Sequence, residues 1–205
     1  AKNILNAGVR LRIPEAAFEL GKLATKEGEH ELAYQSFVRC IDLAAGQPLA
    51  FEAAYHAGNV LELQQRPAAA ERMYRKALGT DGADGFAAAA EPLANLVRRT
   101  VQASAATEAL RPIYQRGIDL KSPDAAQGLG RMLEQTGDWA GPMAAYLQAW
   151  KLGAALPEAW LQLVERFRDG AAAAAAIDET DLLLDEQTLL RLGKVLERRG
   201  LSVPE

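Results

Sequence analysis

The chain contains 205 residues, of which 49% are hydrophobic and only 6% are aromatic. Aromatic and β-branched residues, which sandwiches and barrels need, are too sparse here for an all-β fold. The 23 basic and 27 acidic residues give a formal net charge of −4, which argues against a general nucleic-acid binder.

Helices are predicted along the whole chain, and most of them come in pairs. Residues 1–8 read as the tail of an earlier helix that Gly8 ends, and Pro14 opens the next helix. Apolar residues at helical spacing, interrupted by turns, then predict five helical hairpins in a single array over residues 1–205. The hairpins are expected at about residues 14–45, 48–80, 86–120, 123–154 and 157–184, followed by a capping helix at 186–200.

Two of these hairpins are irregular. In the third, Pro92 falls inside a first helix expected at about residues 86–103, so that helix either kinks or begins later. The second helix of this pair is expected at residues 107–119. In the fifth, the alanine run at 171–176 favours a second helix that extends to about Leu184, and a flexible linker is the alternative.

The hairpins repeat at fixed spacing. Gly21 and Phe37 recur 37 positions later as Gly58 and Tyr74, and the same separation of 16 residues returns between Gly130 and Tyr146. A glycine in the first helix lets the second helix approach closely, and we expect the aromatic ring to fill the space beside it. Small residues follow each ring near the end of the second helix, where the next hairpin would stack. Such hairpins cannot bury their apolar faces alone, so copies must stack.

This pattern resembles the tetratricopeptide repeat family, with Sel1-like repeats as a close alternative. The shared features are a small residue after leucine, an aromatic, a glycine at the turn and a small residue near the end of the second helix. The resemblance implies an all-α fold, a right-handed α-solenoid of stacked antiparallel helical hairpins. It also implies a non-catalytic scaffold or adaptor that binds a protein or peptide segment in a concave groove lined by the first helices.

The groove positions of the family, transferred to this sequence, give seven candidate binding residues. Four would donate hydrogen bonds to a peptide backbone or to acidic side chains, two would be apolar anchors, and the alternative is that these are solvated side chains on exposed helix faces. The residues are Phe18, Lys22, Tyr55, Asn59, Arg99, Gln127 and Arg131. The carboxylate clamp of chaperone-binding members is absent, because His56, Pro92 and Leu96 stand at three of its positions.

Nothing in the sequence points to an enzyme, a cofactor or a metal site. His30 and His56 lie in different hairpins without cysteines or spaced carboxylates suited to zinc, and no Ser–His–Asp or Cys–His arrangement is present. No stretch approaches the ~20 apolar residues that span a bilayer. The single cysteine, Cys40, cannot form an intrachain disulfide, which favours the cytoplasm and leaves the periplasm possible.

Two other functions stay open at this point. The chain could be the helical-repeat portion of a larger bacterial enzyme or of an envelope or secretion assembly. It could also be a homo-oligomerising assembly protein in which the C-terminal helices of one copy dock in the groove of another. Residues 181–192 are more apolar than a capping segment requires, and they are the candidate docking surface.

Overall fold

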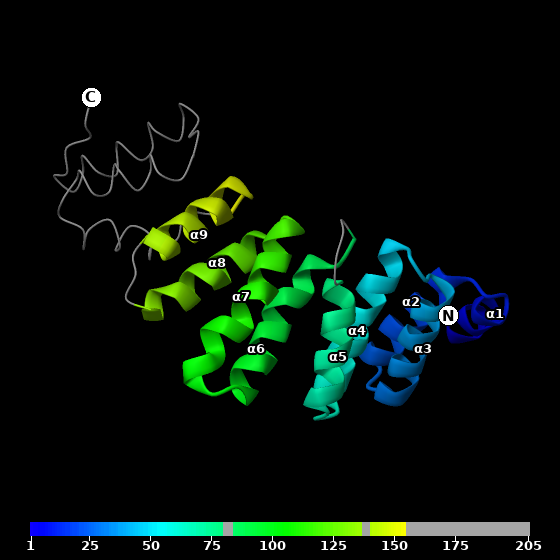
Figure 1. Cartoon of the computed structure of the whole chain (residues 1–205). Coiled ribbons are helices and arrows are strands. Elements are labelled where there is room, and N and C mark those ends of the chain that lie inside the picture. Colours follow the sequence, from blue (N-terminus) through cyan, green and yellow to red (C-terminus); the bar gives the residue numbers. More distant parts are fainter. Residues whose placement is uncertain (80–83, 137–139, 155–205) are drawn as a thin grey trace. The chain divides into compact units, whose positions relative to one another are not determined.

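A computed structural model of the chain describes residues 1–79, 84–136 and 140–154. These residues form α-helices and two short 3-10 turns, and no strand occurs among them (Figure 1). The elements are α1 (Lys2–Arg10), α2 (Pro14–Lys26), α3 (His30–Leu43), α4 (Pro48–Leu63), α5 (Pro67–Leu78), η1 (Ala87–Ala89), α6 (Ala90–Thr100), α7 (Ala103–Asp119), α8 (Pro123–Leu133), η2 (Glu134–Thr136) and α9 (Ala140–Lys151).

The chain divides into two compact units, which are residues 1–129 (unit 1) and residues 130–205 (unit 2). In unit 1 each helix from α1 to α7 packs against the next helix in the chain, and α2 also contacts α4. The pairs α2–α3, α4–α5 and α6–α7 are the expected hairpins, stacked in chain order (Figure 1). The prediction of an all-α solenoid is therefore confirmed. The hairpin expected at 157–184 and the capping helix at 186–200 lie outside the described residues.

One type of C-terminal helix cap recurs along the chain. At the end of α4 the N–H of Gln65 donates to the carbonyl of Glu62 at 2.8 Å, and the N–H of Arg66 donates to the carbonyl of Leu61 at 2.9 Å. Gln65 has a positive φ of 57°, which completes a Schellman motif. The same bond pattern ends α1, α2, α7 and α9, where the left-handed residue is Arg12, Gly28, Lys121 or Gly153.

The expected contacts between glycines and aromatic rings are present. A Cβ added to Gly21 would lie 2.7 Å from the Phe37 ring, and one added to Gly58 would lie 2.5 Å from the Tyr74 ring. Within unit 2, a Cβ on Gly130 would lie 2.5 Å from the ring of Tyr146. All three rings are almost completely buried. The missing side chain of each glycine therefore sets how closely the two helices of a hairpin approach.

The third hairpin departs from this arrangement. Its aromatic residue, Tyr114, packs its ring against Gly128 at the start of the next hairpin, while Arg98 occupies the position 16 residues before Tyr114. The first helix begins late, at Ala90, which places Pro92 in the first turn, where its missing N–H costs nothing.

Two expected helix bounds were wrong. Gly8 does not end the N-terminal helix, because α1 continues to Arg10 and it is Arg12 that takes the left-handed conformation. The second helix of the third hairpin begins at Ala103 and not at Thr107, and it includes Pro112. Glycine was read as a break in the first case, whereas Pro112 lies inside the helix as expected. Gly8 instead lies against Ala16 of α2, so it is retained for close packing.

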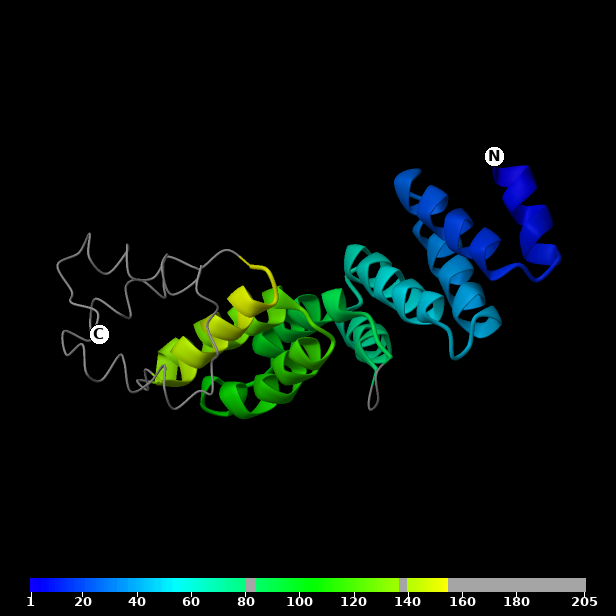
Figure 2. The ribbon, with the colours of Figure 1, turned by 90° about the horizontal axis from the view of Figure 1, so that it is seen from above.

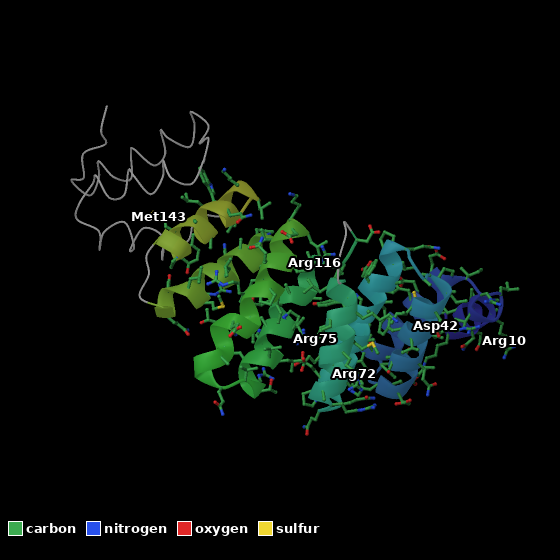
Figure 3. The ribbon with its side chains drawn as sticks, in the orientation of Figure 1. Arg10, Asp42, Arg72, Arg75, Arg116 and Met143 are labelled. Carbon is green, nitrogen blue, oxygen red and sulfur yellow. The ribbon has the colours of Figure 1, made fainter. Side chains whose placement is uncertain are left out.

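The segment between α5 and α6 is held by one arginine of α7. Nε of Arg116 donates to the carbonyl of Leu78 at 3.2 Å, and Nη2 donates to the carbonyl of Asp84 at 2.8 Å. The N–H of Phe86 also donates back to the carbonyl of Ala77 at 2.7 Å. Arg116, labelled in Figure 3, therefore fixes the passage from the second hairpin to the third within unit 1.

Candidate peptide-binding surface

The candidate surface is formed by side chains of the first helices α2, α4 and α6 in unit 1. The residues of this set, which we call the first-helix face, are Phe18, Lys22, Tyr55, His56, Asn59, Glu62 and Arg99. Five of them were predicted as binding residues from the sequence. The packing of these helices in chain order brings the five together, through the contacts described below.

The helices α2 and α4 are joined through aromatic rings. The ring of Phe18 lies edge-on to that of His56, with ring centroids 5.4 Å apart, and the His56 ring stacks on Phe37 at 5.4 Å with an interplanar angle of 18°. Phe18 is only 7% exposed, and Nζ of Lys22 lies 5.4 Å from its ring centroid. Phe18 is therefore mainly a packing residue beneath Lys22, and it offers a ligand little surface.

Tyr55 extends the aromatic contacts toward the third hairpin. Its half-buried ring lies 5.3 Å from His56, 6.0 Å from Tyr74 and 5.1 Å from Phe86, measured between ring centroids. Tyr55 therefore contacts rings of its own hairpin and also Phe86, which belongs to the segment that Arg116 fixes. It is the more accessible of the two predicted apolar anchors.

Burial lowers the pKa of His56. Lys22 lowers it further, while Glu52, whose Oε1 lies 3.9 Å from His56 Nε2, acts in the opposite direction. His56 is therefore neutral at pH 7, which suits its place among aromatic rings. The described residues contain no group of three potential metal ligands.

Asn59 and Glu62 are both in contact with Tyr74 of the second helix. The Tyr74 hydroxyl lies 2.7 Å from Asn59 Oδ1 and 2.7 Å from Glu62 Oε2. A phenol carries one hydrogen, so it donates to one of these oxygens at a time, and the carboxylate is the stronger acceptor. Burial and the neighbouring carboxylate raise the pKa of Tyr74, so its hydroxyl stays protonated at physiological pH.

Glu62 also connects α4 to α6. Its second oxygen, Oε1, lies 3.9 Å from Nη1 of Arg99, a side chain that is 71% exposed. One carboxylate therefore accepts from the Tyr74 hydroxyl beside Asn59 and attracts Arg99 across the hairpin boundary. An ion pair this long and exposed contributes little free energy, so Arg99 can exchange Glu62 for a carboxylate of a ligand.

Lys22 is placed in a similar way. Its Nζ lies 2.9 Å from Oε1 of Glu19, one turn earlier on α2, and about half of each side chain is exposed. Surface pairs of this kind typically contribute about 0–1 kcal/mol, so a ligand carboxylate can compete for Lys22. The two exposed predicted cations of unit 1 thus have carboxylate neighbours that a ligand can replace.

The pairing of glutamate with tyrosine recurs, and sequence reasoning missed it. In unit 2 the Tyr146 hydroxyl donates to Oε1 of Glu134 at 2.7 Å, and the separation of 12 residues matches that between Glu62 and Tyr74. In the first hairpin the ring is Phe37, which has no hydroxyl. The residue 12 positions earlier is Thr25, and its hydroxyl donates to the carbonyl of Gly21 at 2.8 Å instead. Reading the glutamate together with the tyrosine would have found this pair from the sequence.

The third hairpin uses an arginine in place of that glutamate. Nη2 of Arg98 donates to the Tyr114 hydroxyl at 2.7 Å, and Nη1 donates to Oδ1 of Asn95 at 2.6 Å. Arg98 is thus turned toward the packed second helix. Arg98 and Arg99 are both exposed, and Arg99, the predicted binding residue, lies 3.9 Å from Glu62 of α4 instead.

The last two predicted residues both lie on α8. Gln127 is half-buried and belongs to unit 1, whereas Arg131 is exposed and belongs to unit 2. Arg131 lies close enough to Tyr146 to oppose the rise in the pKa of that phenol, which burial and Glu134 cause. The contacts that join α2, α4 and α6 include neither of these residues.

Comparison with known families and structures identifies the repeat. Residues 14–47, which cover α2 and α3, match the family model described as tetratricopeptide repeat. No curated protein sequence matches the chain. In the described part of the chain, no helix is long and apolar enough to cross a membrane.

Several solved structures resemble the chain in fold at low sequence identity. PilF of Pseudomonas aeruginosa is 19% identical, with a TM-score of 0.52, over 94% of this chain and 88% of its own. YrrB, described as a tetratricopeptide repeat protein with an unusual peptide-binding site, is 16% identical, with a TM-score of 0.51, over 98% and 94%. MamA is 15% identical, with a TM-score of 0.50, over 94% and 98%. These likenesses establish a shared helical-repeat fold.

Proposed function

We propose that this chain, a tetratricopeptide repeat protein, is a non-catalytic scaffold that binds a segment of a partner protein along its first-helix face. Proteins with this repeat serve generally as protein-interaction modules, and YrrB, which shares the fold, is described as having a peptide-binding site. The finer proposal is that the site of this chain lies on α2, α4 and α6.

The observation that carries the proposal is the continuous set of contacts across three hairpins. Aromatic packing joins α2 to α4, and Glu62 joins α4 to α6. Side chains that are already held in place lose little conformational entropy when a ligand binds, which favours affinity. On this surface the contacts hold Tyr55 and Glu62 in place, and Lys22 and Arg99 stand exposed beside them.

The chemistry of these positions favours an extended segment with acidic side chains. An asparagine amide offers both a donor and an acceptor, which is what a peptide backbone requires. Lys22 and Arg99 lie on either side of Asn59 in chain order, and each would exchange a carboxylate of its own protein for one of the ligand. Tyr55 would contact an apolar side chain between them.

The test is capture of partners from a lysate of the native organism. The unaltered chain is compared with a Lys22→Ala/Arg99→Ala variant, which should lose the partner while its thermal unfolding stays nearly unchanged, because both side chains are exposed. The matched control is Arg72→Ala/Lys76→Ala on α5, which removes the same charge from a second helix (Figure 3). Equal capture by both variants and the unaltered chain would contradict the proposal.

One alternative function remains a prediction. The chain could be the repeat portion of a larger bacterial enzyme or of an envelope or secretion assembly, and the sequence of the complete gene would test this by revealing an adjoining domain. Self-association through the C-terminal helices is also still a prediction, and it concerns residues outside those described.

A further inference from the structure

Phe86 stands just before the short turn η1, and it was not among the residues predicted to bind a ligand. Its ring centroid lies 5.1 Å from that of Tyr55, and the two ring planes are tilted by 46°. Both residues are half-buried, so part of each side chain remains open to a ligand. Two partly exposed aromatic rings in contact offer a favourable surface to an apolar side chain.

The two rings stand next to the polar part of the first-helix face. Tyr55 lies four residues before Asn59 on α4, which places both residues on one side of that helix. A segment whose backbone is bound at Asn59 would therefore bring a neighbouring side chain over Tyr55 and Phe86. Acidic side chains of the same segment would reach Lys22 and Arg99, whose present carboxylate partners are exposed or distant.

The position of Phe86 depends on Arg116 of α7. The guanidinium donates to the carbonyls of Leu78 and Asp84, which are six positions apart in the chain (78 and 84). These two bonds bring the backbone before Phe86 back to the end of α5, where the N–H of Phe86 donates to the carbonyl of Ala77 at 2.7 Å. The hairpins of unit 1 follow one another in chain order from blue to green in Figure 2, and Arg116 connects the second to the third.

Two glycines make room for these bonds. A Cβ added to Gly79 would lie 2.6 Å from the carbonyl oxygen of Asp84 and 3.2 Å from Nη2 of Arg116. One added to Gly85 would meet the carbonyl oxygen of Leu78, which accepts from Arg116. Gly79 also has a φ of 72°, a conformation that other residues rarely adopt. The backbone here is therefore closed around the guanidinium, whose planar set of donors suits two carbonyls.

We propose that Tyr55 and Phe86 form an apolar subsite for one aliphatic or aromatic side chain of the bound segment, and that Arg116 is the positioning residue that holds Phe86 in this subsite. The inference rests on the proposed function, because it specifies what the segment carries beside its acidic residues. Arg116 belongs to a second helix (Figure 3), so a residue outside the first-helix face affects binding on that face.

A phage-displayed library of random peptides supplies a defined probe for the full chain of residues 1–205. Peptides selected on the unaltered chain should carry an apolar side chain beside acidic ones. The best binder is synthesised, and its dissociation constant is measured by fluorescence polarisation. Phe86→Ala and Arg116→Ala should each weaken its binding about tenfold, as expected for the loss of one anchoring contact. Arg111→Ala, at an exposed position of α7, is the matched control and should leave the affinity unchanged.

Two readouts distinguish a positioning role from a general loss of structure. Arg116→Ala should cause no further loss of affinity in a Phe86→Ala background, because the arginine acts through that ring. In NMR spectra of the ligand-free protein, the nuclear Overhauser contacts between the rings of Tyr55 and Phe86 should disappear in Arg116→Ala, while circular dichroism shows unchanged helix content. If Arg116→Ala loses helix content, Arg116→Lys, which keeps the charge with fewer donors, replaces it in both comparisons.

Several results would overturn the inference. These are full affinity in Phe86→Ala, losses from the two substitutions that simply add, ring contacts that persist without Arg116, and selected peptides that lack an apolar side chain. The variant Lys22→Ala/Arg99→Ala separates this inference from the proposed function. If that variant weakens binding of the peptide and Phe86→Ala does not, only the apolar subsite is wrong. If neither variant weakens binding, the proposed function and this inference both fail.

Discussion

At the scale of single residues, the fold depends on the missing side chain of glycine. Gly58 and Tyr74 show the principle, because the ring occupies the volume that a Cβ on Gly58 would need. Glycine in a helix ordinarily costs about 1 kcal/mol relative to alanine. The close approach of the two helices, and the burial of the tyrosine ring, offset that cost.

The substitution Gly58→Ala should therefore destabilise the protein, although alanine is the better helix former. Because the new Cβ would meet the Tyr74 ring at 2.5 Å, we expect a loss of about 1–3 kcal/mol in the free energy of unfolding. Chemical denaturation measures it. In a Tyr74→Leu background the same substitution should cost much less, since no ring occupies the space. An equal loss in both backgrounds would show that the ring is not the cause.

At the scale of helices, the ends are set by left-handed caps rather than by glycine alone. The cap after α2 uses Gly28, which a sequence reader recognises as a turn. Gln65 and Lys121 adopt the same conformation without a glycine, so no residue type marks these ends. The prolines that open α5 and α8 still place them in the sequence.

A cap residue of this kind is strained, and glycine should relieve it. Gln65→Gly is expected to raise the free energy of unfolding by about 1 kcal/mol, because an L-residue pays that much in the left-handed region and glycine does not. The neighbouring change Gln64→Gly is the matched control. Gln64 has a φ of −80°, so glycine there should lower stability instead. Thermal unfolding measures both variants. If their midpoint temperatures shifted in the same direction, strain at Gln65 would not be the cause.

The regular hairpins could be predicted from the sequence, whereas the ring contact and the helix bounds of the third hairpin could not. The spacing of Gly21, Gly58 and their rings was sufficient to place α2 to α5, because each ring contacts a glycine of its own hairpin. Tyr114 contacts Gly128 of the next hairpin, and the spacing of residues within one hairpin does not reveal a contact between hairpins. The start of α7 was also misplaced, because the helix begins at Ala103 and not at Thr107.

At the scale of the whole molecule, the proposed function depends on the repetition of one hairpin. Six of the seven candidate residues predicted by position lie on first helices in unit 1 and Arg131 lies in unit 2, yet their partners could not be predicted from position. Phe18 was expected to anchor a ligand and is buried, and the contacts of Glu62 with Tyr74 and Arg99 were not predicted. Burial and side-chain partners depend on the exact stacking of neighbouring hairpins, which a pattern of residue types does not specify.

Photocrosslinking from single positions to a captured partner would test the binding surface most directly. A photoreactive residue is placed on first helices in one set of variants and at exposed positions of second helices in another. The sets are Lys22, Asn59 and Arg99, and Arg39, Arg72 and Gln115. We expect the first set to crosslink to the partner and the second set not to. Crosslinks confined to the second set would contradict it and place the partner on the opposite helices.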